Sequence, residues 1–135
     1  MTTTAETRSV IVERDFAASA EKLWRALTQP HLIEEWLMKN DFVPSVGHPF
    51  QLRGDWGTAD CKVLEIEQNT KLSYSWDAMG LKSVVTLTLT PSSAGTHLRV
   101  EQSGFPKQNA QAFAGATYGW TSFLGKLDQV VAREG

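Results

Sequence analysis

The sequence predicts an α+β domain in which an antiparallel sheet packs against one long C-terminal helix. The first observation is residues 108–133, where apolar side chains recur at helical spacing. The second is residues 50–102, where apolar and polar residues alternate along short segments separated by turns. The third is the order of these elements, because strands grouped apart from helices are typical of α+β folds and short turns imply antiparallel pairing.

The long helix is predicted from a single apolar face. Its stripe consists of Phe113, Ala116, Thr117, Trp120, Leu124, Leu127 and Val131. The residues between them are mostly polar, so a helix of roughly seven turns should lie on the sheet through this stripe. Asn109 is a candidate N-cap. Gly115 and Gly119 flank the stripe, either as tolerated solvent-side positions or as a notch that lets the sheet or a ligand approach the helix backbone.

One strand and two short helices are predicted before the sheet proper. Residues 9–16 alternate as a strand, although Arg14 shares the inward side with Val10, Val12 and Phe16. Ser19 offers an N-cap for the first short helix, and Pro30 suits the first position of the second. The inner faces of these helices are Leu23, Trp24 and Leu27, followed by Leu32, Ile33 and Trp36.

Five further strands follow, which gives a six-stranded sheet. They are expected at residues 50–56, 61–67, 72–76, 83–90 and 98–102. The alternation slips between Val63 and Ile66, which indicates a β-bulge, and Gln102 continues the inward side of the last strand. Neither repeats nor linkers interrupt the pattern, so residues 1–135 are interpreted as one domain, with residues 1–7 expected to be disordered.

Composition excludes several classes of function. The 13 Lys and Arg residues are scattered and the formal net charge is −2, which argues against nucleic-acid binding. A single cysteine, Cys61, excludes an intrachain disulfide and fits a reducing compartment. No apolar run approaches a membrane span of about 20 residues and no signal peptide is apparent, so we expect a cytoplasmic protein. His31, His48 and His97 lack metal-type spacing, so we expect no metal. No Walker loop or dinucleotide fingerprint is present, and we expect no cofactor.

Five stretches carry a family resemblance. They are residues 16–24 (FAASAEKLW), 36–50 (WLMKNDFVPSVGHPF), 62–76 (KVLEIEQNTKLSYSW), 95–105 (GTHLRVEQSGF) and 119–120 (GW). Together with the order of elements, they resemble the SRPBCC or START-like superfamily, in its branch related to the activator of the ninety-kilodalton heat-shock chaperone's ATPase. The resemblance implies a helix-grip fold, in which a curved sheet wraps around the C-terminal helix with a cavity between them. Ser19 stands where this branch would have proline, and its capping side chain replaces that residue. Gln102 stands where similar sequences often carry histidine, so the resemblance gives little support for a catalytic role at this position.

The inward positions and the implied cavity together give a set of ligand-binding candidates. They are Arg14, Trp36, Trp56, Tyr74, Trp76, Gln102, Phe113 and Trp120. Each also has a purely structural interpretation. The aromatic residues could simply form the core. Arg14 could mark an exposed strand end or a structural ion pair, and Gln102 a structural hydrogen bond, because an inward polar group needs a partner.

Three functions remain open at this stage. The leading hypothesis is non-enzymatic binding of a small, largely apolar molecule, such as a lipid, an aromatic metabolite or a polyketide-like compound. The second is a chaperone-associated protein, although the family's cochaperones carry an additional N-terminal domain. The third is a cyclase or dehydratase, for which Tyr74 with Arg14 or Asp60 is the nearest titratable pair. No catalytic residue is assigned, and both a monomer and a homodimer are compatible with the sequence.

Overall fold

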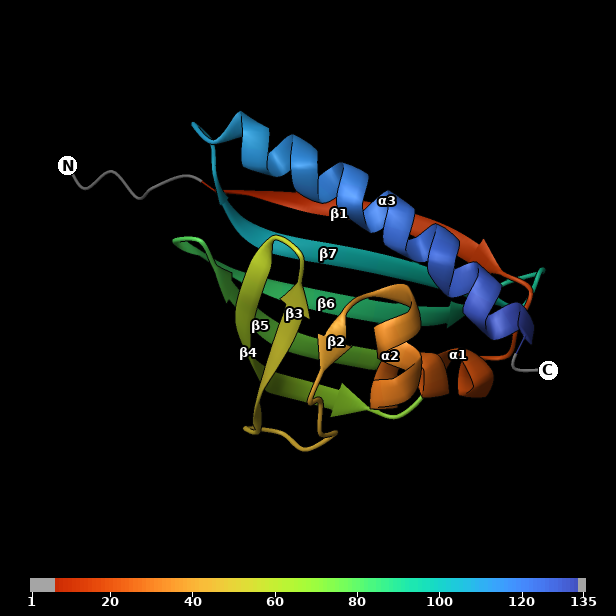
Figure 1. The fold of residues 1–135 in the computed structure, drawn as a ribbon. Helices are drawn as coiled ribbons and strands as arrows, with labels where there is room; N and C mark the ends of the chain where they lie inside the picture. Colours follow the sequence, from red (N-terminus) through yellow and green to blue (C-terminus); the bar gives the residue numbers. More distant parts are fainter. Residues whose placement is uncertain (1–6, 134–135) are drawn as a thin grey trace.

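The computed structural model describes residues 7–133 and has the α+β helix-grip architecture that the sequence predicts (Figure 1). Its elements are β1 (Thr7–Phe16), α1 (Ala20–Thr28), α2 (Pro30–Trp36), β2 (Lys39–Asn40), β3 (Pro49–Gly54), β4 (Gly57–Glu67), β5 (Lys71–Ala78), β6 (Leu81–Pro91), β7 (Thr96–Pro106) and α3 (Ala110–Arg133). The strands form one antiparallel sheet in the order β1-β7-β6-β5-β4-β3-β2, and α3 crosses its inner face.

The described part of the sheet has seven strands rather than the predicted six. The additional strand, β2, pairs Lys39 with Arg53 of β3 and is only two residues long, too short for an alternation to reveal it. The disorder expected for residues 1–7 falls almost wholly outside the described residues. Thr7 is the first residue of β1, opposite Pro106.

The predicted helix starts are confirmed. The Ser19 hydroxyl accepts a hydrogen bond from the Lys22 backbone N–H at 3.2 Å, and Pro30 opens α2. The Asn109 side chain accepts from the Ala112 N–H at 3.1 Å, one of the donors that a helix leaves unpaired in its first turn.

Two β-bulges shape the sheet. The one predicted in β4 is confirmed by a register shift between Val63 and Glu65. The other lies in β7 at Gly104, which has a φ of 112° and approaches β6 so closely that a Cβ there would lie 2.6 Å from the Lys82 carbonyl oxygen. Only glycine fits such a position. The inserted residue resets the alternation, so Gln102 and Phe105 both face inward.

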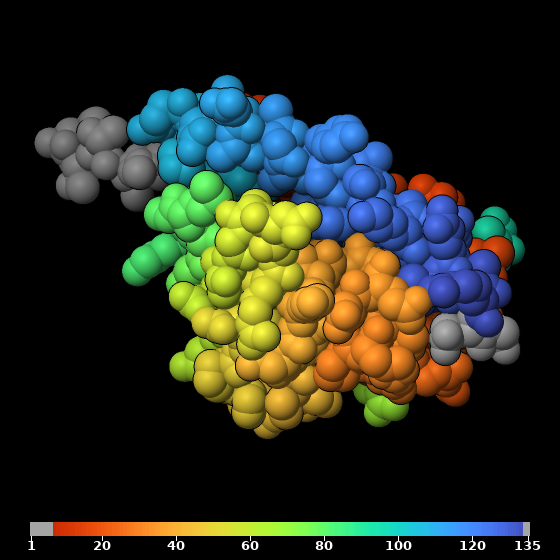
Figure 2. Space-filling model, viewed as in Figure 1, coloured from red at the N-terminus to blue at the C-terminus, as the bar shows by residue number. Residues whose placement is uncertain are grey.

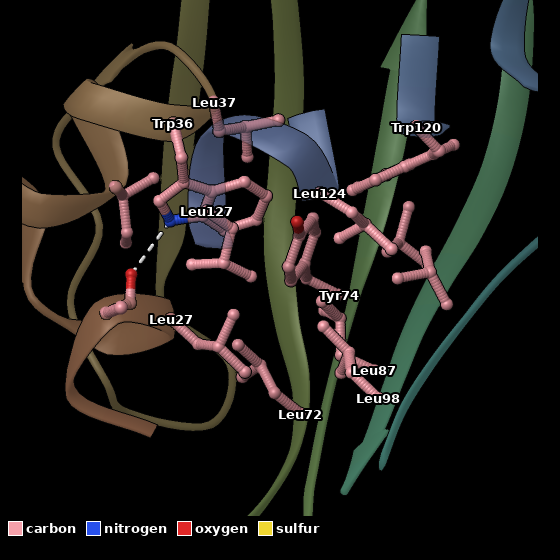
Figure 3. Packing of buried hydrophobic residues seen from close by; sticks show 14 of the residues in the cluster. Leu27, Trp36, Leu37, Leu72, Tyr74, Leu87, Leu98, Trp120, Leu124 and Leu127 are labelled. Atoms are coloured by element: carbon pink, nitrogen blue, oxygen red, sulfur yellow. Dashed lines mark hydrogen bonds between the residues drawn. The ribbon is translucent and has the colours of Figure 1, made fainter. Parts of the chain in front are cut away.

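One end of the inner face is a closed core. Leu124, Leu127, Val130 and Val131 of α3 are buried in the same cluster as the inner faces of α1 and α2. Figure 3 shows Trp36, Tyr74 and Leu127 packed within this core. The Trp36 indole N–H donates to the Ala26 carbonyl at 2.9 Å, the dashed line in Figure 3, so its polar edge is satisfied. Within residues 7–133, no helix is both long and apolar enough to cross a membrane.

Candidate functional site

The other end of the inner face holds an open cavity of about 610 Å³. It lies between the first half of α3 and the tips of the β3–β4 and β5–β6 hairpins. Its lining residues are Met38, Trp56, Trp76, Ala78, Met79, Leu81, Gln102, Phe105, Asn109, Gln111, Ala112, Gly115, Ala116, Gly119, Trp120 and Phe123. In Figure 2 the yellow tip of β3–β4 and the green tip of β5–β6 lie beside the light-blue first half of α3.

The helix side of the cavity is made of small residues. Ala112, Gly115, Ala116 and Gly119 recur at the spacing that places them on one face of α3. A Cβ built on Gly115 would meet no atom within 4 Å, and one on Gly119 would meet only Phe123 at 3.8 Å. The helix therefore leaves unfilled space where larger side chains would fit.

A chain of hydrogen bonds forms the polar part of the wall. The Trp120 indole N–H donates to Gln102 Oε1 at 2.8 Å, Gln102 Nε2 donates to Ser83 Oγ at 2.9 Å, and Ser83 Oγ donates to the Trp76 carbonyl at 2.7 Å. Because an indole nitrogen only donates, the oxygen of the Gln102 amide must face Trp120, which fixes the orientation of the amide. Gln102 is 4% exposed. Beyond these bonds its amide keeps one N–H and one oxygen lone pair.

Aromatic rings form the apolar wall. The Trp120 ring centroid lies 5.9 Å from that of Trp76 and 5.7 Å from that of Phe123, both in edge-to-face geometry. Phe105, turned inward by the Gly104 bulge, adds a fourth ring and meets Phe113 edge-on at 6.0 Å. The cavity thus presents ring faces and edges beside a single buried amide group, that of Gln102.

Two hairpin turns form the mouth. Trp56 was expected on a strand face, but β3 ends at Gly54 and Trp56 lies in the turn, 43% exposed. Its ring lies over Gly54, since a Cβ at residue 54 would lie 2.8 Å from Trp56 Nε1. Met79, in the β5–β6 turn, has a φ of 53° and is 86% exposed. Large apolar side chains therefore stand partly in solvent at the entrance.

The structure divides the eight ligand-site candidates into three groups. Trp56, Trp76, Gln102 and Trp120 line the open cavity. Trp36 and Tyr74 instead border a closed space of about 10 Å³ in the core, the size of a single water site. The expected inward direction is correct for both, but at their end of the sheet α2 and the second half of α3 fill the space.

The remaining two candidates lie at the edges of the fold. Arg14 does face α3, yet β1 is an edge strand, so its guanidinium reaches the surface and pairs with Asp128 at 3.2 Å. Phe113 packs on Phe105 and lies beneath the Arg8 guanidinium, whose carbon is 3.8 Å from the ring centroid. The structural interpretation therefore accounts for Arg14, and neither residue lines the cavity.

Sequence reasoning missed several lining residues. Phe105 lies beyond the last expected strand, residues 98–102, although Gly104 just before it is a signal for a bulge that continues the strand. The small residues of α3 were only partly recognised, through Gly115 and Gly119, and a count of helical spacing would have added Ala112. Met79 and Phe123 had no local signal, because their role depends on how the hairpin and helix meet.

The titratable groups considered for an enzyme are not brought together. Arg14 on β1 and Tyr74 on β5 are separated by three strand spacings, about 14 Å. Asp60 is exposed and accepts a hydrogen bond from the Gln51 side chain at 2.9 Å. Burial raises the pKa of the Tyr74 phenol, which keeps it protonated.

Comparison with known proteins agrees with this fold. The sequence model of the family described as activator of Hsp90 ATPase homolog 1-like protein matches residues 17–132. The chain belongs to this family. The resemblance inferred from the sequence is thereby confirmed. A search of curated proteins gives no match.

Solved structures of similar proteins show the same architecture. Protein MLL2253 from Mesorhizobium loti is 55% identical, with 95% of this chain and 99% of that chain covered and a TM-score of 0.91. BH1534 from Bacillus halodurans is 28% identical over 92% and 96% of the two chains, with a TM-score of 0.82. CalU16 from Micromonospora echinospora is 27% identical over 95% and 78%, with a TM-score of 0.81.

Proposed function

We propose that this protein binds a small, largely apolar molecule in the cavity beneath the first half of α3, without converting it. The observation that carries the proposal is the cavity itself. Its volume of about 610 Å³ lies within the range of roughly 300–1,000 Å³ that is usual for small-molecule sites. Its walls combine aromatic rings with one buried amide, the mixture of apolar surface and a few polar anchors that such sites contain.

The contrast with the closed core supports the proposal. Along the same helix, Leu124, Leu127 and Val131 are buried in the core, whereas Ala112, Gly115 and Ala116 leave space between helix and sheet unfilled. Open apolar surface is costly in water, and a ligand that covers it recovers part of that free energy. Lipids, aromatic metabolites and polyketide-like compounds all have the required character.

The chaperone-associated function rests on the family description alone. The enzyme hypothesis has less support, because Tyr74, Arg14 and Asp60 lie apart. We therefore place binding first, and a pull-down of the chaperone with this single domain tests the second function separately.

Binding can be tested with a cavity-filling variant. A panel of lipids and aromatic metabolites is screened by thermal shift and native mass spectrometry, and hits are titrated by tryptophan quenching, since Trp56, Trp76 and Trp120 line the site. Gly115→Leu places a large side chain in the open space and should abolish binding of each hit while the protein stays folded. The reason is steric, because the added side chain occupies the volume that the ligand needs.

Gly125→Leu is the matched control. Gly125 lies in the second half of α3, does not line the cavity, and likewise has open space around its Cβ position. The two variants share the change in helix propensity and hydrophobicity, so only the cavity distinguishes them. Equal loss of binding in both variants, or a panel without a single hit on the wild-type protein, would refute the proposal.

A further inference from the structure

The cavity differs from its surroundings in charge. Among the described residues, none with an ionisable side chain lines it. Its polar side chains are the amides of Gln102, Asn109 and Gln111 together with the indole groups of Trp56, Trp76 and Trp120. A chain with 28 charged residues thus has none of the described ones in the walls of this apolar cavity.

We propose that the cavity selects uncharged ring compounds that carry a hydrogen-bond acceptor and discriminates against carboxylates of the same shape. This inference rests on the proposed binding function and specifies its ligand class. A cavity of this kind would bind neutral aromatic ligands more tightly than fatty acids and other anionic lipids. The apolar character of the walls alone would not distinguish these two classes.

Desolvation is the first reason. A carboxylate that enters an apolar cavity loses hydration, and the loss is offset only by a cation or several directed donors. The described wall supplies no cation, and the Arg8 guanidinium next to it already lies over the Phe113 ring at 3.8 Å. A neutral carbonyl loses far less hydration and needs a single donor.

The Gln102 amide is the second reason. Its oxygen accepts from Trp120 and one of its hydrogens goes to Ser83, so the orientation is set before any ligand arrives. The remaining N–H can donate to a ligand carbonyl or hydroxyl oxygen. The surrounding rings of Trp76, Trp120 and Phe105 favour a flat partner, which can stack or meet them edge-on.

The N-terminal end of α3, at the rim of the cavity, would by itself favour a carboxylate. The first turn of α3 lies at the mouth, and the N-terminal end of a helix attracts anions. Here the chain satisfies part of that end itself, because the Asn109 side chain accepts from the Ala112 N–H at 3.1 Å. One of the first-turn donors that would hold a carboxylate is therefore occupied.

The test compares two probes that differ in charge. 2-Acetylanthracene and anthracene-2-carboxylate share the ring system and the carbonyl, and both are titrated at pH 7 by tryptophan quenching. We expect the Kd of the ketone to be lower by at least about tenfold, which corresponds to roughly 1.4 kcal/mol. Equal affinities, or tighter binding of the carboxylate, would overturn charge selection.

A charge variant makes the test independent of probe solubility. Gln111→Lys places a cation at the rim and should narrow the ratio of the two Kd values by at least about threefold, because the carboxylate gains a partner. Gln129→Lys introduces the same charge on an exposed position of the same helix, away from this cavity, and should leave the ratio unchanged. An unchanged ratio in Gln111→Lys contradicts the inference.

The failure of the inference can be told from that of the proposed function. If neither anthracene probe binds while some compound of the screening panel does, the ligand class is wrong and the binding function stands. If no compound of any class binds to the wild-type protein, both fail.

Discussion

The two halves of α3 pack differently on the same sheet. From Leu124 onward the helix presents large aliphatic side chains, and the space between helix and sheet is closed. Before Trp120 it presents alanine and glycine, and the space is an open cavity of about 610 Å³. Trp120 stands at the boundary, 2% exposed, with its indole N–H bonded to Gln102.

The difference shows how a small domain can keep an apolar cavity and still fold. Burial of Leu124, Leu127, Val130 and Val131 holds the helix on the sheet, so the first half does not have to contribute equally. In the first half the small helix residues leave the space beside the sheet unfilled. Stability, and the binding that we propose, thus depend on successive stretches of one helix.

The largest expected effect is loss of stability in the closed half. Leu127→Ala, at a position with 0% exposure, should lower the free energy of unfolding by about 2–5 kcal/mol, since it leaves a cavity in a packed region. Ala116→Gly in the open half removes a methyl group that lines the cavity and should cost only about 1 kcal/mol, mainly through helix propensity. Urea unfolding measures the free energy of unfolding of both variants. Similar losses would contradict the distinction between a closed and an open half of α3.

At the boundary, Trp120→Phe should destabilise the protein by about 1–3 kcal/mol, because Gln102 Oε1 loses its buried donor. A double-mutant cycle with Gln102→Leu measures the coupling free energy between Trp120 and Gln102. Ser83 keeps its bond to the Trp76 carbonyl without Gln102, so the double variant should lose less than the sum of the single variants. Additive losses would indicate that the polar wall does not act as one network.

The fold could be predicted from the sequence because its signals are local and repeated. Alternation along the strands, the stripe of α3, the caps at Ser19 and Asn109 and the slip near Val63 each depend on a few neighbouring residues. The two-residue β2 had no such signal, since its pairing with β3 is decided by distant parts of the chain.

The site could be predicted only in part. The side of the sheet that a residue faces follows from its neighbours in the sequence, whereas the filling of the space between sheet and helix depends on distant residues. The inward direction was correct for Trp36, Tyr74, Trp76 and Trp120, yet two of them border the cavity and two are enclosed. Which end is filled depends on where α2 packs and on the volumes along α3. Phe105 shows the same limit, since the Gly104 bulge reverses its side of the strand.

The mouth of the open half allows a smaller test. Gly54→Ala adds a Cβ 2.8 Å from Trp56 Nε1, so the exposed indole must move from its place beside Met38. The end of a flexible side chain can shift cheaply, and we expect a stability change within about 0.5 kcal/mol together with a clear change in tryptophan emission and in the ligand association rate. On a Trp56→Phe background the emission change should vanish. Its persistence there would show that another tryptophan responds and that Trp56 does not rest on Gly54.

The smallest expected effect lies at the closed end, on the outer face of the sheet. His97 there has Nε2 2.8 Å from a Glu13 oxygen and Nδ1 2.7 Å from an Asp15 oxygen. The hydrogen bond to Glu13, and then that to Asp15, raises the pKa of His97 above its ordinary value of 6.5, because both ring nitrogens must be protonated to donate. A raised pKa in the folded state gives stabilisation that is complete below the unfolded pKa and is lost as pH rises through the folded pKa.

The free energy of unfolding should therefore decline gradually above about pH 6.5. His97→Gln should flatten that decline, and chemical unfolding measured between pH 5 and pH 9 checks both curves. The Kd of a neutral ligand should not follow the same curve, since no described ionisable side chain lines the cavity. Stability that rises with pH through the His97 titration would refute the assignment of the ion pair. A ligand Kd that tracks the titration would instead mean that the two ends of the molecule are coupled, and that the two halves of α3 do not work independently.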